Sequence, residues 1–555
     1  MIKEQFVKLY ENSFKENWDL KAYSDYGTDV NYTYGELARE VAKLHLFFEK
    51  TGVQQGDKIS LIGKNSSRWA ITYLATVTYG AVIVPILPDF NPNDIHHIIN
   101  HSDSVLLFVT KKIWDNLEEE KIPEVKGVMS LNSFKFLHEK NDGTVESIMM
   151  NLDKDFDAKY PNGFTKEDVL YPEISNAEIA SINYTSGTTG FSKGVVMPGN
   201  GLAGNVMFGI NSKLLKRNDR TLCFLPVAHA YGCAFDFLTS SAVGAHTTFL
   251  SKIPSPKVLL KAFEEVKPTI IFTVPLIMEK IYKKQLLPVL NSRAMKVALN
   301  IPLLDNKIYS EMRKKLIQAL GGSFYEVIIG GAPMNKEVEQ FLTKIKFPFT
   351  IGYGMTECAP LISYRDHKEF VPFSAGQILD TMEVKILSNN PYEEVGEICV
   401  RGENVMYGYY KNDEATKEVI DEEGWLHTGD LGTISKEGDI FIRGRNKSMI
   451  LGANGQNIYP EEIEAKLNNM PFVMESLIVE KNGKLIALVY PDYESIDESN
   501  ISQSDMQALM DENLKNLNKM LGAYENVSKI QLYPNEFEKT PKKSIKRYLY
   551  NQIIE

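Results

Sequence analysis

A loop of glycines, threonines and serines between two apolar segments constrains the fold of this chain more than any other feature. Residues 179–183 before the loop and residues 194–197 after it are short and apolar enough to predict strands. Glycines let backbone N–H groups converge on an anion, and hydroxyl groups and a lysine add further donors. The stretch therefore predicts a phosphate-binding loop, made by Thr185, Ser186, Gly187, Thr188, Thr189, Gly190 and Lys193.

Two other types of loop are alternatives to a phosphate-binding loop here. A polar hairpin turn has a similar composition. A Walker A loop needs Gly-Lys followed by Ser or Thr at the start of a helix, whereas Lys193 is followed by Gly194 and Val195. The pattern excludes the Walker A loop and leaves the hairpin turn as the alternative.

Strands and helices alternate over much of the chain, which predicts an α/β fold with mostly parallel sheets. Residues 32–53 and 69–77 repeat apolar side chains at helical spacing, and the more polar residues 135–180 predict an elaboration on the surface. The predicted strands are residues 58–62, 81–86, 106–109, 269–275 and 326–331. The segment 81–86 is apolar throughout, which predicts a strand buried on both faces.

From about residue 376 the pattern changes to short segments that alternate polar and apolar side chains. Residues 382–386, 396–401 and 439–442 predict antiparallel strands of a small β subdomain, over about residues 376–445. A chain of 555 residues exceeds what one core supports. We expect a large first domain over residues 1–445 and a small α+β domain over residues 446–555.

Bulk composition narrows the environment and the partners of this chain. A net charge of −11 and a pI near 5.5 argue against a general nucleic-acid binder. Four scattered cysteines without a CxxC pair suit a reducing cytoplasm and predict no metal site of their own. The first residues lack a signal-peptide pattern, and no apolar run approaches the roughly 20 residues that span a bilayer. Peripheral contact with a membrane remains open.

Two sharp turns after predicted strands complete the set of predicted ligand-binding residues. Small turns allow a flat ring to approach the backbone, and Tyr353 offers a face for stacking. Thr356 offers a hydroxyl group to a phosphate, and Glu357 offers a carboxylate to Mg²⁺. Singly, each would fit an ordinary structural role as well. The remaining turn residues are Gly331, Ala332, Pro333, Gly352, Gly354 and Met355.

The loop near residue 187 and these turns resemble those of the acyl-adenylate-forming family, which includes acyl-CoA synthetases, adenylation domains and beetle luciferases. The resemblance covers nearly the whole chain, and the layout looks most like bacterial long-chain fatty acyl-CoA synthetases. It implies that residues 1–445 form an adenylation domain and residues 446–555 a lid. It also implies ATP, Mg²⁺ and CoA as ligands, with Thr185 and Glu357 at the metal.

Further roles follow from the resemblance. His229, although a lone histidine is more often a packed core residue, would line the carboxylate site. Asp430 would accept hydrogen bonds from both ribose hydroxyls, unless it only caps its turn. Arg445, fifteen residues further on, matches the family arginine at the ribose.

The end of the chain carries the residues that the resemblance assigns to domain motion. Lys447 matches the hinge, and Gly455 lies in the segment that would let a pantetheine arm pass. A lysine in the tail bridges the acyl carboxylate and the α-phosphate in the family. An ungapped match places Ser544 there, and we assign the role to Lys543, with Lys546 close by.

The resemblance implies a ligase that converts a carboxylic acid, of medium or long chain, into an acyl adenylate and then a CoA thioester. A carrier protein as acceptor, or an amino or aryl acid as substrate, would leave these motifs unchanged. A luciferase-type oxygenase would share them too. A nucleotide-binding sensor without activity is the non-enzymatic alternative.

Overall fold

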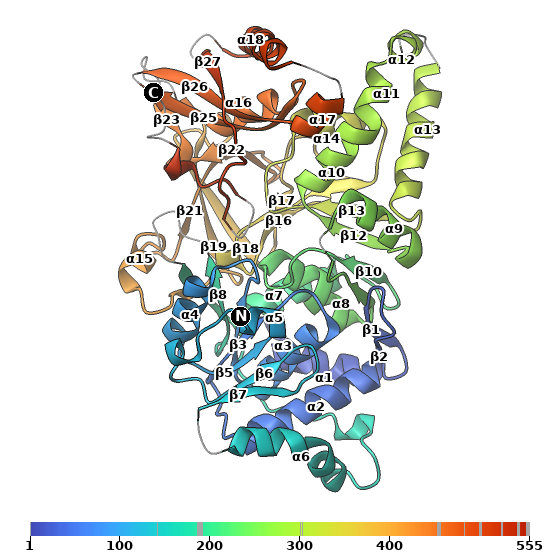
Figure 1. Ribbon diagram of the computed structural model, residues 1–555, viewed down its shortest axis with the longest axis vertical. Coiled ribbons are helices and arrows are strands. Elements are labelled where there is room, and N and C mark those ends of the chain that lie inside the picture. The colour runs from blue at the N-terminus through green and yellow to red at the C-terminus, as the bar shows by residue number, and fades with distance from the viewer. Residues whose placement is uncertain are drawn as a thin grey trace.

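An eight-stranded sheet forms the centre of the lower part of the molecule in Figure 1. The computed structural model describes residues 2–140, 143–185, 192–252, 254–299, 301, 304–451, 457–481, 483–498, 502–522, 525–540 and 544–550. The strand order is β20-β9-β8-β4-β3-β5-β6-β7, with β8 to β6 parallel and antiparallel pairs at both edges. The strands are β3 (Lys58–Ile62), β4 (Val82–Ile86), β5 (Ser104–Val109), β6 (Gly127–Ser130), β7 (Phe136–Glu139), β8 (Ile179–Thr185), β9 (Lys193–Pro198) and β20 (Gly408–Tyr409).

Three of the described helices around this sheet, α2, α3 and α4, begin at a residue whose side chain caps the first turn. α2 starts with a capping box, in which Thr33 and Glu36 exchange hydrogen bonds. The polar stretch 135–180 contributes more than a surface elaboration, because it holds edge strand β7 and a long helix, α6, whose Phe156 is buried against the core. The helices are α1 (Phe6–Glu16), α2 (Tyr34–Lys50), α3 (Ser67–Tyr79), α4 (Pro92–His101), α5 (Lys111–Trp114) and α6 (Thr144–Lys159).

Two further sheets lie above the first. The order β10-β11-β1-β2 is parallel except at β2, and β12-β13-β14 is parallel throughout. Their strands are β1 (Lys21–Asp25), β2 (Asn31–Thr33), β10 (Arg220–Cys223), β11 (His246–Phe249), β12 (Ile270–Thr273), β13 (Glu326–Ile329) and β14 (Phe349–Ile351). The accompanying helices are α7 (Gly199–Asn211), the π-helical segment η3 (Gly232–Thr239), α8 (Ser240–Val243), α9 (Pro256–Val266) and α14 (Lys336–Lys344).

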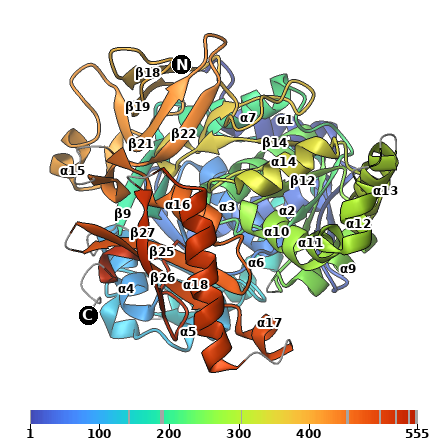
Figure 2. The ribbon, with the colours of Figure 1, turned by 90° about the horizontal axis from the view of Figure 1, so that it is seen from above.

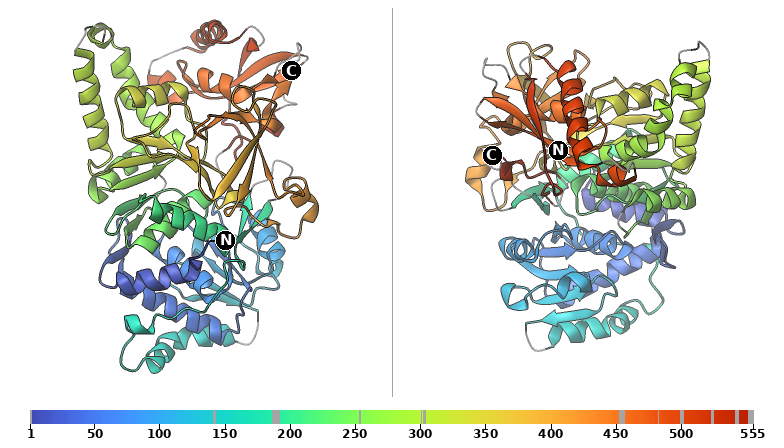
Figure 3. Two further views of the ribbon diagram at one scale, coloured as in Figure 1. Left: turned by 180° about the vertical axis from the view of Figure 1, so that it is seen from behind. Right: turned by 45° about the horizontal axis from the view of Figure 1, so that its top comes forward.

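Residues 275–319, between β12 and β13, form a set of helices that rises away from the sheets (Figures 1 and 3). In the views, α11 and α13 run side by side and α12 lies at their far end. The helices are α10 (Pro275–Ile281), the π-helical segment η4 (Tyr282–Leu286), α11 (Leu287–Asn291), α12 (Arg293–Ala298) and α13 (Leu304–Ala319).

The predicted β subdomain is an antiparallel sheet of order β18-β19-β21-β22. Its strands are β18 (Met382–Leu387), β19 (Gly396–Gly402), β21 (Leu426–Ile434) and β22 (Ile440–Arg445), with α15 (Asp413–Lys417) beside them. A smaller sheet of β15 (Tyr353–Gly354), β16 (Leu361–Tyr364) and β17 (Gln377–Ile378) connects it to β14.

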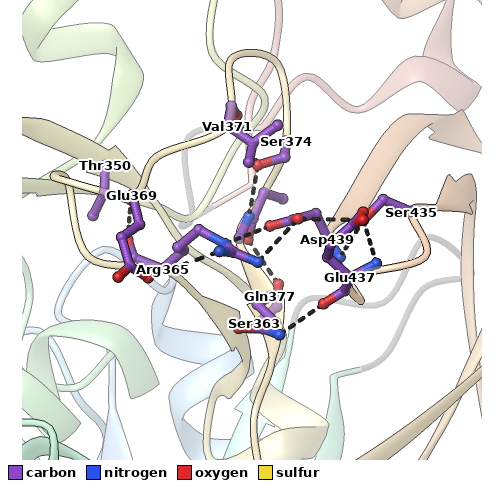
Figure 4. Close-up of polar contacts among 12 residues, drawn as sticks. Thr350, Ser363, Arg365, Glu369, Val371, Ser374, Gln377, Ser435, Glu437 and Asp439 are labelled. Carbon is purple, nitrogen blue, oxygen red and sulfur yellow. Dashed lines mark hydrogen bonds and ion pairs between the residues drawn. The ribbon is translucent and has the colours of Figure 1, made fainter.

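A buried ion pair fixes the β subdomain to the α/β part (Figure 4). The Arg365 guanidinium donates to both carboxylate oxygens of Asp439, with N···O distances of 2.8 and 3.1 Å. The Thr350 hydroxyl of β14 donates to the Arg365 carbonyl, and the Gln377 side chain donates to the Glu437 carbonyl. Because these contacts cross from β14 to the turn before β22, they set where the β subdomain lies.

The C-terminal residues form a compact α+β unit with a hydrophobic core of its own, which includes Ile463, Val489 and Met510. Figure 2 shows α18 lying across its sheet. The strands, in the order β25-β26-β27, are β25 (Val473–Lys481), β26 (Lys484–Pro491) and β27 (Val527–Leu532), and the helices are α16 (Pro460–Leu467), α17 (Tyr493–Glu498) and α18 (Gln503–Lys519).

The expected α/β fold, with a β subdomain followed by a small α+β unit, is confirmed. Within the residues that the structure describes, no helix has the length and apolar character needed to cross a bilayer.

Candidate active site

A cleft lies where β13 and β14 end. These strands are parallel neighbours, so their carboxyl ends meet at the same edge of the sheet, where α/β proteins bind ligands. The lining residues include Leu214, His229, Tyr231, Phe235, Phe272, Ile328, Gly330, Gly331, Gly352, Tyr353, Gly354, Met355, Thr356 and Tyr364.

Two of the predicted turns need glycine for measurable reasons. A Cβ on Gly354 would lie 2.1 Å from the Pro360 carbonyl oxygen, so only glycine allows this close approach of two backbone segments. Gly331 has a φ of +85°, in the left-handed region. Ala332 and Pro333 follow it in an exposed loop.

A buried aspartate joins the turn of Tyr353 to the β subdomain. The Tyr353 hydroxyl donates to Asp430 Oδ2 at 2.7 Å, and Arg445 Nε donates to Asp430 Oδ1 at 2.9 Å. Asp430 and Arg445 are cross-strand partners of β21 and β22, which explains their spacing in the sequence. Asp430 is only 4% exposed and raises the pKa of Arg445. The structure thus brings three predicted residues together.

The turn that carries Asp430 is held from β19 by Glu397. One carboxylate oxygen of Glu397 accepts from the Gly429 N–H at 3.0 Å, and the other lies 3.1 Å from His427 Nδ1. Cys399 Sγ lies 3.6 Å from the same nitrogen. Lys385 is the cross-strand partner of Cys399, and its positive charge opposes a cation at this point. We therefore interpret the group as a support of the turn.

The two ends of the predicted phosphate loop are cross-strand partners. Thr185 of β8 pairs with Lys193 of β9, and the Thr185 hydroxyl donates to the Lys193 carbonyl at 3.5 Å. The strands predicted on either side of the loop are therefore confirmed. The residues between them that were assigned to phosphate, Ser186, Gly187, Thr188, Thr189 and Gly190, lie outside the described residues.

Tyr409 connects the base of this loop to the predicted metal ligand. Its ring centroid lies 4.9 Å from Lys193 Nζ, and its hydroxyl donates to Glu357 Oε1 at 3.1 Å. Tyr409 belongs to β20, which pairs with β9 more than 200 residues away in the sequence. Sequence reasoning missed Tyr409, because nothing local in the sequence signals this pairing.

The residues predicted at Mg²⁺ fit a hard cation. Glu357 lies in the short turn η5 (Thr356–Cys358) and accepts the hydrogen bond of the Tyr409 hydroxyl. Thr185 is the cross-strand partner of Lys193, whose Nζ lies over the Tyr409 ring. A carboxylate and a hydroxyl oxygen are the donors that Mg²⁺ prefers.

His229, which the resemblance placed at the acyl site, lies in the loop after β10 and lines the cleft. Its Nδ1 accepts from the Tyr231 N–H at 3.4 Å, so in the neutral ring the proton lies on Nε2. The Tyr231 hydroxyl donates to the Ile328 carbonyl, which fixes the loop against β13.

The predicted residues of the chain's end are placed in part. Lys447 is exposed in the turn η6 (Asn446–Ser448) directly after β22. Gly455 and Lys543 lie outside the described residues. Lys546 is paired with Glu538 at 2.5 Å, and Arg547 forms an ion pair with Glu464.

Glycine turns at the carboxyl ends of the parallel strands β13 and β14, joined through Tyr353 to a buried aspartate of β21, are typical of an α/β enzyme site that binds nucleotides. Comparison with protein families identifies the family. Residues 10–410 match the model described as AMP-binding enzyme, and the chain belongs to this family.

Similar proteins agree with this assignment. Long chain acyl-CoA synthetase 6, peroxisomal, of Arabidopsis thaliana is 30% identical over 528 residues, which are 87% of this chain and 73% of that protein. The anthranilate CoA ligase AuaEII, solved with anthranoyl-AMP, has a TM-score of 0.77 at 19% identity and covers 98% of this chain and 96% of its own. O-succinylbenzoate coenzyme A synthetase of Bacillus subtilis, solved with ATP and a magnesium ion, has a TM-score of 0.73 at 19% identity, covering 97% and 98%.

Proposed function

We propose that this chain is an AMP-forming acyl-CoA synthetase, which activates a fatty acid with ATP and transfers the acyl group to CoA. The observation that carries the proposal is one cleft lined by His229, by apolar side chains and by Tyr353, whose hydroxyl donates to Asp430. The named function of the Arabidopsis relative supports it.

In the first step, a carboxylate oxygen of the acid attacks the α-phosphorus of ATP and pyrophosphate leaves. Asp430 would accept hydrogen bonds from the ribose hydroxyls, and the Tyr353 turn would contact adenine. Lys193, together with Ser186, Gly187, Thr188, Thr189 and Gly190, would neutralise the phosphate charge. Mg²⁺ would be held by Thr185 and Glu357 and would supply further positive charge there.

In the second step, the CoA thiol attacks the acyl carbonyl and AMP leaves. The two steps require different residues of the C-terminal unit: Lys543 first and the Gly455 segment second. We place the domain boundary at residue 445, with residues 446–555 as a lid that turns about Lys447.

Polar contacts of the lid support this rotation. Asn335 of the first domain exchanges hydrogen bonds with Asn469 at 2.7 and 3.0 Å, and Lys336 pairs with Glu462 at 3.2 Å. Such contacts can be exchanged for water at little cost, unlike a continuous apolar interface.

The apolar side of the cleft supports a fatty acid as substrate. Phe235 and Phe272 stack with centroids 5.8 Å apart, and Leu214 and Ile328 lie beside them. Among the described lining residues, His229, Tyr231 and Tyr364 add a few polar side-chain groups to this apolar wall, which suits a single carboxylate at the end of an alkyl chain. We expect the enzyme to act in the cytoplasm.

A panel of carboxylic acids in a pyrophosphate-release assay, with and without CoA, tests the proposal. We expect release with medium- and long-chain fatty acids, and AMP and acyl-CoA as products when CoA is added. If pyrophosphate is released but a thioester forms only with an acyl carrier protein, the carrier protein and not CoA is the acceptor. If pyrophosphate is released selectively with amino or aryl acids, one of these acids and not a fatty acid is the substrate. ATP binding without any AMP release would contradict the proposed enzymatic activity.

A further inference from the structure

The helices of residues 275–319 carry exposed apolar side chains at the end that points away from the sheets. Val289 in α11, Val297 in α12, Ile301 between α12 and α13, and Leu304 at the start of α13 are 45%, 65%, 47% and 38% exposed. We call this set the apolar tip. Figures 1 and 3 show α12, and with it the tip, at the far end of the projection.

The same projection is strongly basic. Residues 275–319 contain nine lysines and arginines against three acidic residues, a net charge of +6, although the whole chain carries −11. Lys280, Lys307, Lys314 and Lys315 are exposed. A concentration of positive charge on one element of an acidic protein marks a surface for an anionic partner.

The base of the projection is fixed, whereas its apolar tip is not covered by the rest of the described chain. The Tyr282 hydroxyl donates to Glu337 of α14, within the first domain, at 3.0 Å. Met312 and Leu316 of α13 are buried. The tip is therefore presented on a rigid support.

We propose that the apolar tip docks on an anionic lipid surface, with its side chains at the headgroup–acyl boundary and the lysines over the headgroups. Apolar insertion and electrostatic attraction together give stable membrane binding, where one signal alone is marginal. Each basic residue near an anionic surface strengthens the electrostatic attraction, and burial of apolar area adds to the binding. A second copy of this chain fits less well, because two surfaces of net charge +6 would repel each other.

Sedimentation with lipid vesicles tests the proposal on the full-length protein. We expect binding to vesicles of phosphatidylcholine and phosphatidylglycerol, little binding to phosphatidylcholine alone, and loss of binding at high salt. The double variant Val289→Asp/Val297→Asp should reduce the bound fraction by about tenfold, and so should Lys307→Gln/Lys314→Gln/Lys315→Gln.

A matched control uses exposed apolar residues outside the projection. Met150 in α6 and Leu170 are 79% and 71% exposed, so Met150→Asp/Leu170→Asp adds the same charge elsewhere and should bind as wild type. Unchanged thermal unfolding and unchanged pyrophosphate release with a soluble acid would show that the tip variants are folded.

Three results would overturn the proposal. The wild-type protein could fail to bind anionic vesicles, or the folded tip variants could bind as well as wild type. A wild-type dimer that the tip variants convert to monomer, measured by analytical ultracentrifugation without lipid, would assign the tip to a second copy instead.

Discussion

The Tyr409 hydroxyl donates a hydrogen bond to Glu357 Oε1, while the Tyr409 ring lies against Lys193 Nζ. One side chain thus links the base of the phosphate loop to the carboxylate proposed at Mg²⁺. We interpret Tyr409 as a positioning residue, because it orders two groups that contact the nucleotide in the proposed reaction.

Tyr409→Phe keeps the ring beside Lys193 and removes the hydrogen bond to Glu357. A hydrogen bond to a charged group contributes about 1.5–3 kcal/mol, so we expect kcat for pyrophosphate release to fall by about tenfold or more. The Mg²⁺ concentration at half-maximal rate should rise. Tyr410→Phe, which removes a hydroxyl bonded to Asp103 at 2.8 Å, is the control. If the Mg²⁺ concentration at half-maximal rate is unchanged in Tyr409→Phe, Tyr409 does not position Glu357 for the metal.

Asp430→Asn tests the proposed ribose contact. The substitution preserves shape but removes the charge that accepts from Tyr353 and Arg445. We expect KM for ATP to rise by about ten- to hundredfold, with little change in KM for the acid. Glu383→Gln, at an exposed ion pair with Arg401 in the same subdomain, should leave both constants unchanged. Equal increases in both constants would indicate a general loss of structure.

Asp236 lies fully buried in η3, and neither carboxylate oxygen has a hydrogen-bond partner among the described residues. Burial raises its pKa well above the ordinary value. The folded protein therefore holds a proton that the unfolded chain releases above a pKa of about 3.9, and stability decreases as pH rises from there toward the folded-state pKa.

Asp236→Asn removes this proton linkage. We expect the variant to unfold at a higher temperature than wild type, with a difference that is larger at pH 8 than at pH 5. Thermal unfolding across this range measures it. A pH-independent difference would show that Asp236 is charged in the folded protein or has an unidentified partner.

Arg365→Ala should destabilise the junction of the β subdomain, because it leaves the Asp439 carboxylate buried without its partner. Removal of one member of a buried ion pair costs about 3–5 kcal/mol. The double variant Arg365→Met/Asp439→Leu should recover much of the loss. Arg401→Ala, at an exposed pair, should change stability by less than about 1 kcal/mol. Denaturant titration compares the variants, and equal effects of Arg365→Ala and Arg401→Ala would contradict the structural role.

Lys447→Pro tests the hinge, because proline restricts the backbone of residue 447 and of the residue before it. Thioester formation should fall much more than pyrophosphate release, since only the second step needs the rotated lid. Lys447→Ala, which keeps backbone freedom, should affect both steps little. Parallel loss of both activities in the proline variant would place the hinge elsewhere.

The sequence by itself determined the local elements and the residues at their ends. The apolar run at 81–86 predicted β4, all of whose residues are buried, because a strand covered on both faces has no polar side. Asp430 and Arg445 were predicted as a pair from the resemblance to the family, and the structure shows them as cross-strand partners of β21 and β22. Gly331 was predicted in a sharp turn after a strand, and its left-handed backbone is what the structure adds.

Only the tertiary structure decided which distant segments meet. Tyr409 reaches Glu357 because β20 adds to the edge of β9, and Arg365 reaches Asp439 because the β subdomain packs on β14. Periodicity reports which face of an element is buried, but it carries no information about the partner that buries it. Contacts between residues far apart in the chain depend on that choice of partner, which is made when the whole core packs.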